Sequence, residues 1–311
     1  MARSGELILL GLFAVGAMAM PGGSATAGEP PPGLFGPWLD PQTMLERLFG
    51  DQSEDDEKAL ARIEVSAQEE RRIGEAAIQS ALAELKRQQV AVVTRGRDVE
   101  YLRALVETIC PMMTNAKRYR RVTIYLAESP RCDARSFPGG HLVFFRGLLD
   151  AAESEAALIG MVGHELAHLD RGHVLSRARR VKLAEQTFAG KTPGTSLGEF
   201  FSAGTAAARL WTRPFQPEYE LAADRDGARW AYLAGYDPRE LGALFLRAGQ
   251  RDWAGRIPLP GFLESHPPPE TRHRAILDLY DALQRERPND DLWIGKENLR
   301  RRTPWKGRQG R

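Results

Sequence analysis

A five-residue pattern of two histidines and a glutamate constrains this chain more than any other feature. His164, Glu165 and His168 form a His-Glu-x-x-His motif. On an α-helix of about 3.6 residues per turn, the two histidines project from one face. Both imidazoles can then reach one metal ion, while the Glu165 carboxylate holds a metal-bound water as general base. The motif therefore predicts a catalytic zinc site on a helix.

The motif has an alternative interpretation as a coincidence in a helical scaffold. The histidines would then form ion pairs with acids such as Asp170 on the helix surface. The residues before the motif are almost wholly apolar and predict burial instead: Leu158, Ile159, Met161, Val162 and Gly163. Two buried histidines beside a buried glutamate need a functional reason.

A catalytic zinc site needs a third protein ligand and an open position for water. The metzincin pattern fails, because Arg171 and Val174 stand where it needs Gly and His. Glu220 is the better candidate, since it lies four residues before Asp224 on one helical face. One acid can bind the metal and the other can hydrogen-bond a ligand histidine. Glu218 is the second choice of ligand, and an exposed acidic helix start is the alternative without a metal.

Apolar periodicity predicts an α+β chain that is mainly α-helical, with a small β-sheet beside the helix of the motif. The expected helices cover about 57–93, 99–113, 153–181, 217–234, a stretch opening at 237, and 267–283; the expected strands cover 122–126 and 141–145. The segment 190–217, rich in Gly, Ser, Thr and Ala, is expected to form a lid with one short helix.

The second expected strand could present a free edge to substrate, because it follows a glycine turn and ends just before the metal helix. Its residues are Gly140, His141, Leu142, Val143 and Phe144. A peptide could bind there as an added strand, and main-chain pairing makes little demand on sequence. That mode suits unfolded or misfolded polypeptides. The alternative is an ordinary core strand.

The N-terminus has the organisation of a signal peptide. Arg3 precedes an apolar run from Leu7 to Met20, and Ala25 and Ala27 supply the small residues that a signal peptidase needs. We expect cleavage after Ala27 and export to the periplasm or cell envelope, with an uncleaved membrane anchor as the alternative. The predicted divisions are a signal peptide (1–27), a Pro/Gly-rich and acidic linker (28–56), a metallopeptidase domain (57–285) and a basic C-terminal tail (286–311).

Charge and cysteine content say little about partners. The net charge of +2, from 43 basic and 41 acidic residues, gives no field that would draw nucleic acid to the protein. The six basic side chains from Arg300 to Arg311 favour a solvated tail, with docking to phosphate or anionic lipid, and hence peripheral membrane association, as the alternative. Cys110 and Cys132 could form a disulfide or stay as two buried thiols.

Several separate segments resemble metallopeptidase family 48, the HtpX, Oma and CAAX prenyl endopeptidase group of gluzincins. The family's Asn-Ala-x-x-x-Pro-Gly-Gly segment is similar to residues 133–140. Its other motifs, in chain order, are similar to His164, Glu165, His168 and His173, to Glu220 and Asp224, to Gly235-Tyr236-Asp237-Pro238, and to Ser265-His266-Pro267 with Arg272. The resemblance runs from about residue 69 to residue 283. Two residues depart from the pattern, since Asp133 replaces Asn and Arg135 replaces an apolar residue.

The resemblance implies a zincin-like fold with one zinc ion per chain. His164, His168 and Glu220 would bind the zinc, and Glu165 would be the base. Asp224 and His173 would support the ligands from behind. Arg272 or His266 would stabilise the oxyanion. In some relatives the equivalent of His266 approaches the zinc and keeps the enzyme latent, whereas a simple helix-start role is the alternative.

The predicted function is that of a zinc metalloendopeptidase that hydrolyses unfolded or misfolded cell-envelope proteins in quality control. The alternative is a chaperone-like assembly factor that binds unfolded proteins with little turnover.

Overall fold

The computed structural model describes residues 58, 60–189, 213–250 and 267–307. The predicted signal peptide, the linker, His266 and nearly all of the predicted lid lie outside these ranges. All of the elements described below belong to the unit Asp40–Arg311. Its secondary structure is mainly helical with a small mixed sheet, which confirms the predicted α+β class.

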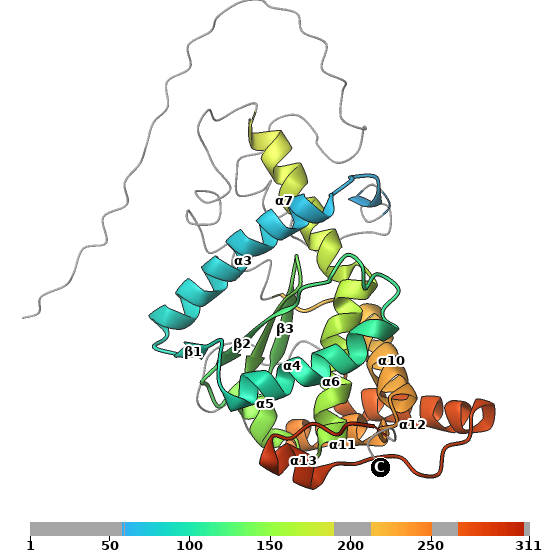
Figure 1. Cartoon of the computed structure of the whole chain (residues 1–311). Helices are drawn as coiled ribbons and strands as arrows, with labels where there is room; N and C mark the ends of the chain where they lie inside the picture. The colour runs from blue at the N-terminus through green and yellow to red at the C-terminus, as the bar shows by residue number, and fades with distance from the viewer. Residues whose placement is uncertain (1–57, 59, 190–212, 251–266, 308–311) are drawn as a thin grey trace, which may run out of the picture. The chain divides into compact units, whose positions relative to one another are not determined.

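The sheet has four strands and lies beside helix α6 (Glu155–Asp170) (Figure 1). The strands are β1 (Val92–Val93), β2 (Thr123–Ala127), β3 (Ala134–Phe137) and β4 (His141–Phe145), in the order β1-β2-β4-β3. Strand β4 runs parallel to β2 and antiparallel to β3. Gly139 and Gly140 make the tight β3–β4 turn with φ of 75° and 85°, a conformation that favours glycine.

The predicted free edge at residues 140–144 is wrong. Strand β4 is paired on both sides, and all five of its residues are buried. Among the described strands, the outer strand on the far side of β4 from β2 is β3, which no sequence pattern predicted as a strand. The reason is visible in composition: the run His-Leu-Val-Phe-Phe is the apolar type that both faces of a central strand require, whereas the short Ala-Arg-Ser-Phe segment carries a charge suited to an edge.

Helix α6 is the centre of the fold and is buried from Glu155 through Leu169, which explains its continuous apolar sequence. Helices α4 (Arg97–Ile109), α10 (Pro217–Leu233) and α11 (Arg239–Gln250) pack around it. The other α-helices of the described residues are α3 (Ala67–Arg87), α5 (Arg146–Ala151), α7 (His173–Ala189), α12 (Pro269–Glu286) and α13 (Lys296–Arg301). Helices α3 and α7 pack against each other, as Figure 1 also shows.

Two facing glycines let α6 and α10 approach at backbone distance. A Cβ on Gly163 would lie 2.8 Å from the Cα of Gly227, and a Cβ on Gly227 would lie 2.6 Å from the backbone nitrogen of His164. No real side chain fits at these distances. The contact brings α10, which carries Glu220, against the motif helix.

The single helix predicted over 153–181 is two helices. Helix α6 ends at Asp170, Gly172 takes φ of 78°, and α7 starts at His173. A glycine with positive φ just after a helix is a common terminator, and it redirects the chain. The turn matters for the site, because it brings His173 back beside α6.

The predicted tail from residue 286 is also wrong as far as Gly307, the last described residue. Trp305 stacks on Trp293 with ring centroids 5.4 Å apart, and its edge packs on Tyr236. The carbonyls of Ile294 and Gly295 accept hydrogen bonds from the first amides of α6. Large apolar side chains thus hold this segment on the domain, which therefore extends past residue 285.

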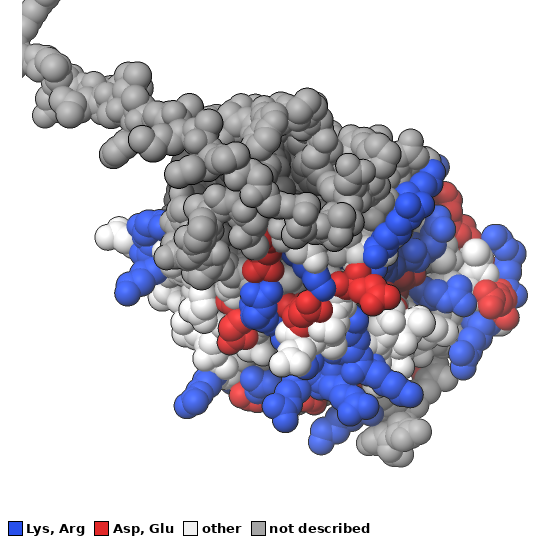
Figure 2. Space-filling model, turned by 90° about the horizontal axis from the view of Figure 1, so that it is seen from above, with Lys and Arg blue, Asp and Glu red and all other residues white. Residues whose placement is uncertain are grey.

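The structure tests three further sequence expectations. Cys110 and Cys132 are not joined by a disulfide bond. Among the described residues, no helix has the length and hydropathy to cross a bilayer. Basic and acidic side chains are interspersed on the face in Figure 2, in keeping with the nearly balanced charge of the chain.

Candidate metal centre

His164 and His168 of α6 and Glu220 of α10 meet in one buried cluster. The Nε2 atoms of the two histidines lie 3.1 Å apart. Glu220 Oε2 is 3.4 Å from His164 Nε2, and Glu220 Oε1 is 3.7 Å from His168 Nε2. All three side chains are at most 2% exposed. The structure therefore brings together the three residues predicted as metal ligands.

The donor set and its spacing fit a zinc ion. Two imidazole nitrogens and one carboxylate are a common catalytic zinc set with an open fourth position. Ligand atoms at the corners of a tetrahedron with bonds of about 2.0–2.2 Å lie about 3.3–3.6 Å apart. The ligand atoms here lie within 4.8 Å of one another, with the closest approaches near that range. Glu218, the second choice, is exposed.

Asp224 fixes the ring of His164 from behind. Its Oδ1 lies 2.8 Å from His164 Nδ1, which leaves Nε2 facing the cluster. Burial by itself would lower the pKa of His164, but the hydrogen bonds to Asp224 and Glu220 outweigh it and raise that pKa to about 9. A carboxylate behind a ligand histidine orients the ring and makes it more basic.

Arg272 holds Asp224 with two hydrogen bonds. Its Nε and Nη2 donate to the two carboxylate oxygens at 2.7 and 2.6 Å, and its guanidinium packs 3.6 Å above the Phe245 ring. Arg272 is fully buried. Asp224 thus bridges His164 and Arg272, a position suited to orienting a ligand. The predicted oxyanion role of Arg272 stays a prediction, and His266 lies outside the described residues.

His168 has a corresponding support on its other side. Its Nδ1 lies 2.9 Å from Nδ1 of His173, whose ring stacks on Tyr219, and Phe215 stacks on His168 at 4.2 Å. Burial lowers the pKa of His168 to about 4 and that of His173 to about 2, so both rings are neutral near pH 7. If His168 presents an Nε2 lone pair to a metal, its Nδ1–H must donate to His173.

Glu165 lies in the same buried site and is 3% exposed. Burial raises the pKa of its carboxyl to about 7, against the opposing influence of His164 and of a hydrogen bond from Ser136. The Ser136 hydroxyl donates to Glu165 Oε2 at 2.7 Å. No sequence pattern singled out Ser136, although it lies within the 133–140 segment that resembles the family pattern.

The two departures from the family pattern pair with each other. Asp133 Oδ2 lies 3.0 Å from Arg135 Nε and 2.8 Å from Arg131 Nη2. An acid at residue 133 and a base at residue 135 therefore neutralise each other at the edge strand. The departures change the local chemistry of β3 and leave the three candidate ligands untouched.

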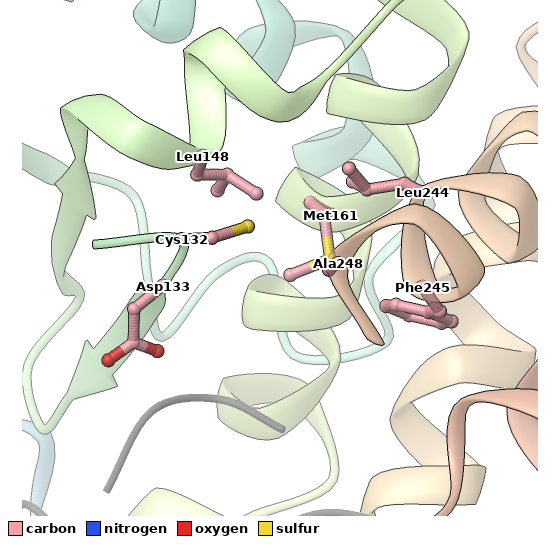
Figure 3. Close-up of a pocket in the computed structure, with 7 residues that line it drawn as sticks. All are labelled: Cys132, Asp133, Leu148, Met161, Leu244, Phe245 and Ala248. Atoms are coloured by element: carbon pink, nitrogen blue, oxygen red, sulfur yellow. The ribbon is translucent and has the colours of Figure 1, made fainter. Parts of the chain in front are cut away.

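Figure 3 shows a small cavity whose lining includes none of the three candidate metal ligands. Its volume is about 10 Å³, room for about one water molecule. The lining residues are Cys132, Asp133, Leu148, Met161, Leu244, Phe245 and Ala248. The cavity is too small for a peptide side chain and lies where the residues just before β3 pack against α5, α6 and α11.

The fold and the site define a metal-dependent hydrolase, and comparison with known proteins agrees. The model of peptidase family M48 matches residues 97–279, more than half of the chain. This chain therefore belongs to peptidase family M48 and is a metallopeptidase, as the sequence resemblance and the predicted enzyme class implied.

Among curated proteins, the chain is 26% identical over 159 residues to the mitochondrial metalloendopeptidase OMA1 of Arabidopsis thaliana, covering 49% of this chain and 30% of that protein. It is 25% identical over 188 residues to the human OMA1 metalloendopeptidase, covering 55% and 35%. It is 26% identical over 188 residues to the beta-barrel assembly-enhancing protease of Escherichia coli K12, covering 55% and 37%. The aligned parts span about a third of these relatives.

Proposed function

We propose that this protein is a zinc-dependent endopeptidase that cleaves unfolded or misfolded polypeptides of the cell envelope. His164, His168 and Glu220 are the proposed zinc ligands, and Glu165 is the proposed general base. The observation that carries the proposal is the meeting of these three donors in one buried cluster, with the Glu165 carboxylate beside them.

Zinc, when bound, supplies Lewis acidity to the scissile carbonyl and to an attacking water. The chain's own residues supply the proton transfers and the alignment. Glu165 takes a proton from the water and delivers it to the leaving amine, a task that its raised pKa near 7 suits. Asp224 and His173 hold the two imidazoles so that both Nε2 atoms converge.

The edge strand β3 supports an extended substrate. It pairs with β4 on one side, and Ser136 on this strand contacts Glu165, so a peptide added at its other edge would lie near the proposed base. A peptide added there would be held through its main chain, which an extended, unfolded segment offers along its whole length. The corrected position, β3 in place of β4, thus preserves the proposed substrate class.

The envelope location rests on two supports. The N-terminal residues have the organisation of a signal peptide. A bacterial relative is named a beta-barrel assembly-enhancing protease, which favours a role in envelope protein quality control. We therefore propose that the protein acts in the periplasm or cell envelope.

The test compares purified wild-type protein with the Glu165→Gln variant. We expect about one zinc per chain in both proteins, and cleavage of a permanently unfolded protein such as reduced, alkylated casein only by the wild type. Removing a general base costs about 10²–10⁴-fold in rate. Zinc binding and suppression of aggregation without any cleavage would instead support a chaperone-like factor. Equal cleavage by both proteins would contradict the proposed role of Glu165.

A further inference from the structure

Ser136 is joined to the proposed base by a short hydrogen bond. Its Oγ lies 2.7 Å from Glu165 Oε2, and the two residues come from different elements, the edge strand β3 and helix α6. Ser136 is 6% exposed and Glu165 is 3% exposed, so bulk water does not compete freely for this contact. A hydrogen bond to a carboxylate in such a place is stronger than one at the surface.

The direction of this hydrogen bond differentiates the two carboxylate oxygens. A carboxylate can only accept, so the serine hydroxyl must donate its single proton to Oε2. The serine thereby engages one lone pair of Oε2, which makes Oε1 the better acceptor for a proton from water. The apolar neighbours of Glu165 on α6 can confine its side chain but cannot select the rotation of its carboxylate plane, since they offer no donor.

The backbone of β3 fixes the position of the hydroxyl. Ser136 pairs with Leu142 in the register of the β3–β4 ladder, and that ladder is antiparallel and regular through Ala134–Phe137. The Pro138-Gly139-Gly140 turn ends the strand, and a Cβ on Gly139 would come within 2.9 Å of Arg71 Cα on α3. The hydroxyl is therefore presented from a backbone held on one side by β4 and at its end by α3.

We propose that Ser136 is a positioning residue that holds Oε2 of Glu165 so that Oε1 faces the attacking water. The same contact joins the base to the strand on which an extended substrate pairs. Binding of a peptide along β3 then steadies the base together with its support. This inference rests on the proposed function, because it assigns a helper to the proposed base.

The experiment uses the full-length zinc-loaded protein and three variants. Ser136→Ala removes the hydroxyl. Ser136→Thr keeps a hydroxyl on a β-branched residue that strands accept. Ser129→Ala is the matched control, since Ser129 is 4% exposed, lies in the loop after β2 and bonds the Arg131 amide, away from Glu165. Each protein is measured for zinc content, melting temperature, kcat and KM, and crystal structures are determined for wild type and Ser136→Ala.

We expect Ser136→Ala to lower kcat about tenfold with KM and zinc content unchanged, the loss that corresponds to about 1.4 kcal/mol in the barrier. Ser136→Thr should recover most of kcat, and Ser129→Ala should match the wild type. The crystal structures should show one Glu165 carboxylate orientation in the wild type and a different or divided one in Ser136→Ala.

Two results would overturn the inference. One is a Ser136→Ala enzyme whose kcat stays within twofold of the wild type; the other is an identical Glu165 orientation in both crystal structures. A wild-type protein with no peptidase activity would overturn the proposed function, and the crystallographic comparison, which needs no turnover, would then decide the role of Ser136 alone.

Discussion

The two ends of helix α6 each bury a glutamate, but the partners of the two carboxylates differ. Near the N-terminal end, Glu155 accepts hydrogen bonds from the Tyr101 hydroxyl at 2.9 Å, the Tyr236 hydroxyl at 3.0 Å and the Trp305 amide at 2.9 Å. Near the C-terminal end, Glu165 lies among histidines and a second acid. Burial raises the pKa of both carboxyls.

The difference shows that burial alone does not identify a functional carboxylate. Glu155 is surrounded by neutral donors from three separate segments, so its carboxylate ties α4, the loop after α10 and the C-terminal segment to α6. Beside Glu165 lie three side chains that can bind one cation, namely His164, His168 and Glu220. The chemistry of the partners, in place of the raised pKa, separates a structural acid from a catalytic one.

The largest expected effect comes from loss of the metal site near the C-terminal end of α6. His168→Ala, or removal of metal with a chelator, should reduce peptide hydrolysis by about a thousandfold or more, because two remaining donors hold zinc poorly. Metal analysis and proteolysis of an unfolded substrate measure the effect. Added zinc should restore the chelated wild type and should fail to restore His168→Ala. Full activity in a metal-free preparation would contradict the assignment.

The second prediction concerns Glu155, the buried acid near the N-terminal end of α6. Glu155→Ala leaves the Tyr101 and Tyr236 hydroxyls and the Trp305 amide without their acceptor, and should lower the free energy of unfolding by about 2–4 kcal/mol. Urea unfolding monitored by circular dichroism measures it. The folded fraction should keep its zinc content and its kcat. If the variant is as stable as the wild type, the structural role assigned to Glu155 is wrong.

A third prediction tests whether Asp224 supports the candidate metal ligand His164. Asp224→Asn should weaken zinc affinity by about 10–100-fold, because the amide supports the His164 ring less well than the carboxylate does. Competition with a fluorescent zinc chelator measures the affinity. Asp226→Asn on the same helix is the control, since among the described residues Asp226 pairs with the exposed Arg171. Equal affinities in the two variants would argue against the supporting role of Asp224.

The smallest expected effect is a pH dependence of the free energy of unfolding that comes from Glu155. Folding raises the pKa of Glu155, so the folded protein binds a proton at this carboxyl more readily than the unfolded chain does. As pH rises above the pKa of the unfolded chain, ionisation of Glu155 therefore lowers the free energy of unfolding. Glu155→Gln lacks this dependence. The wild-type free energy of unfolding, relative to the variant, should fall with a slope of at most about 1.4 kcal/mol per pH unit. A rising difference would mean that the pKa is lowered instead.

Local sequence was enough to predict the motif helix and the helix that carries Glu220. Both follow from periodicity and from boundary residues such as Pro217, which act within a few turns of the chain. The pairing of Glu220 with the motif could be predicted from two acids four residues apart together with the family resemblance. The break at Gly172 was missed, because an apolar pattern continues across it.

Three features of the site were decided by tertiary structure. The free edge moved from β4 to β3, since strand order depends on pairings between distant segments that periodicity does not encode. Ser136 acquired its contact with Glu165 only through that placement. The C-terminal segment packs on the domain because Trp293 and Trp305 contact residues distant in the sequence, such as Tyr236.

The sequence by itself determined the family, the metal-binding residue types and most of the helices, because these depend on spacing along one helix. Tertiary structure decided how close those residues come. Gly163 and Gly227 illustrate the reason: neither stands out in the sequence, yet only their missing side chains let α6 and α10 touch and bring Glu220 to the histidines of the motif.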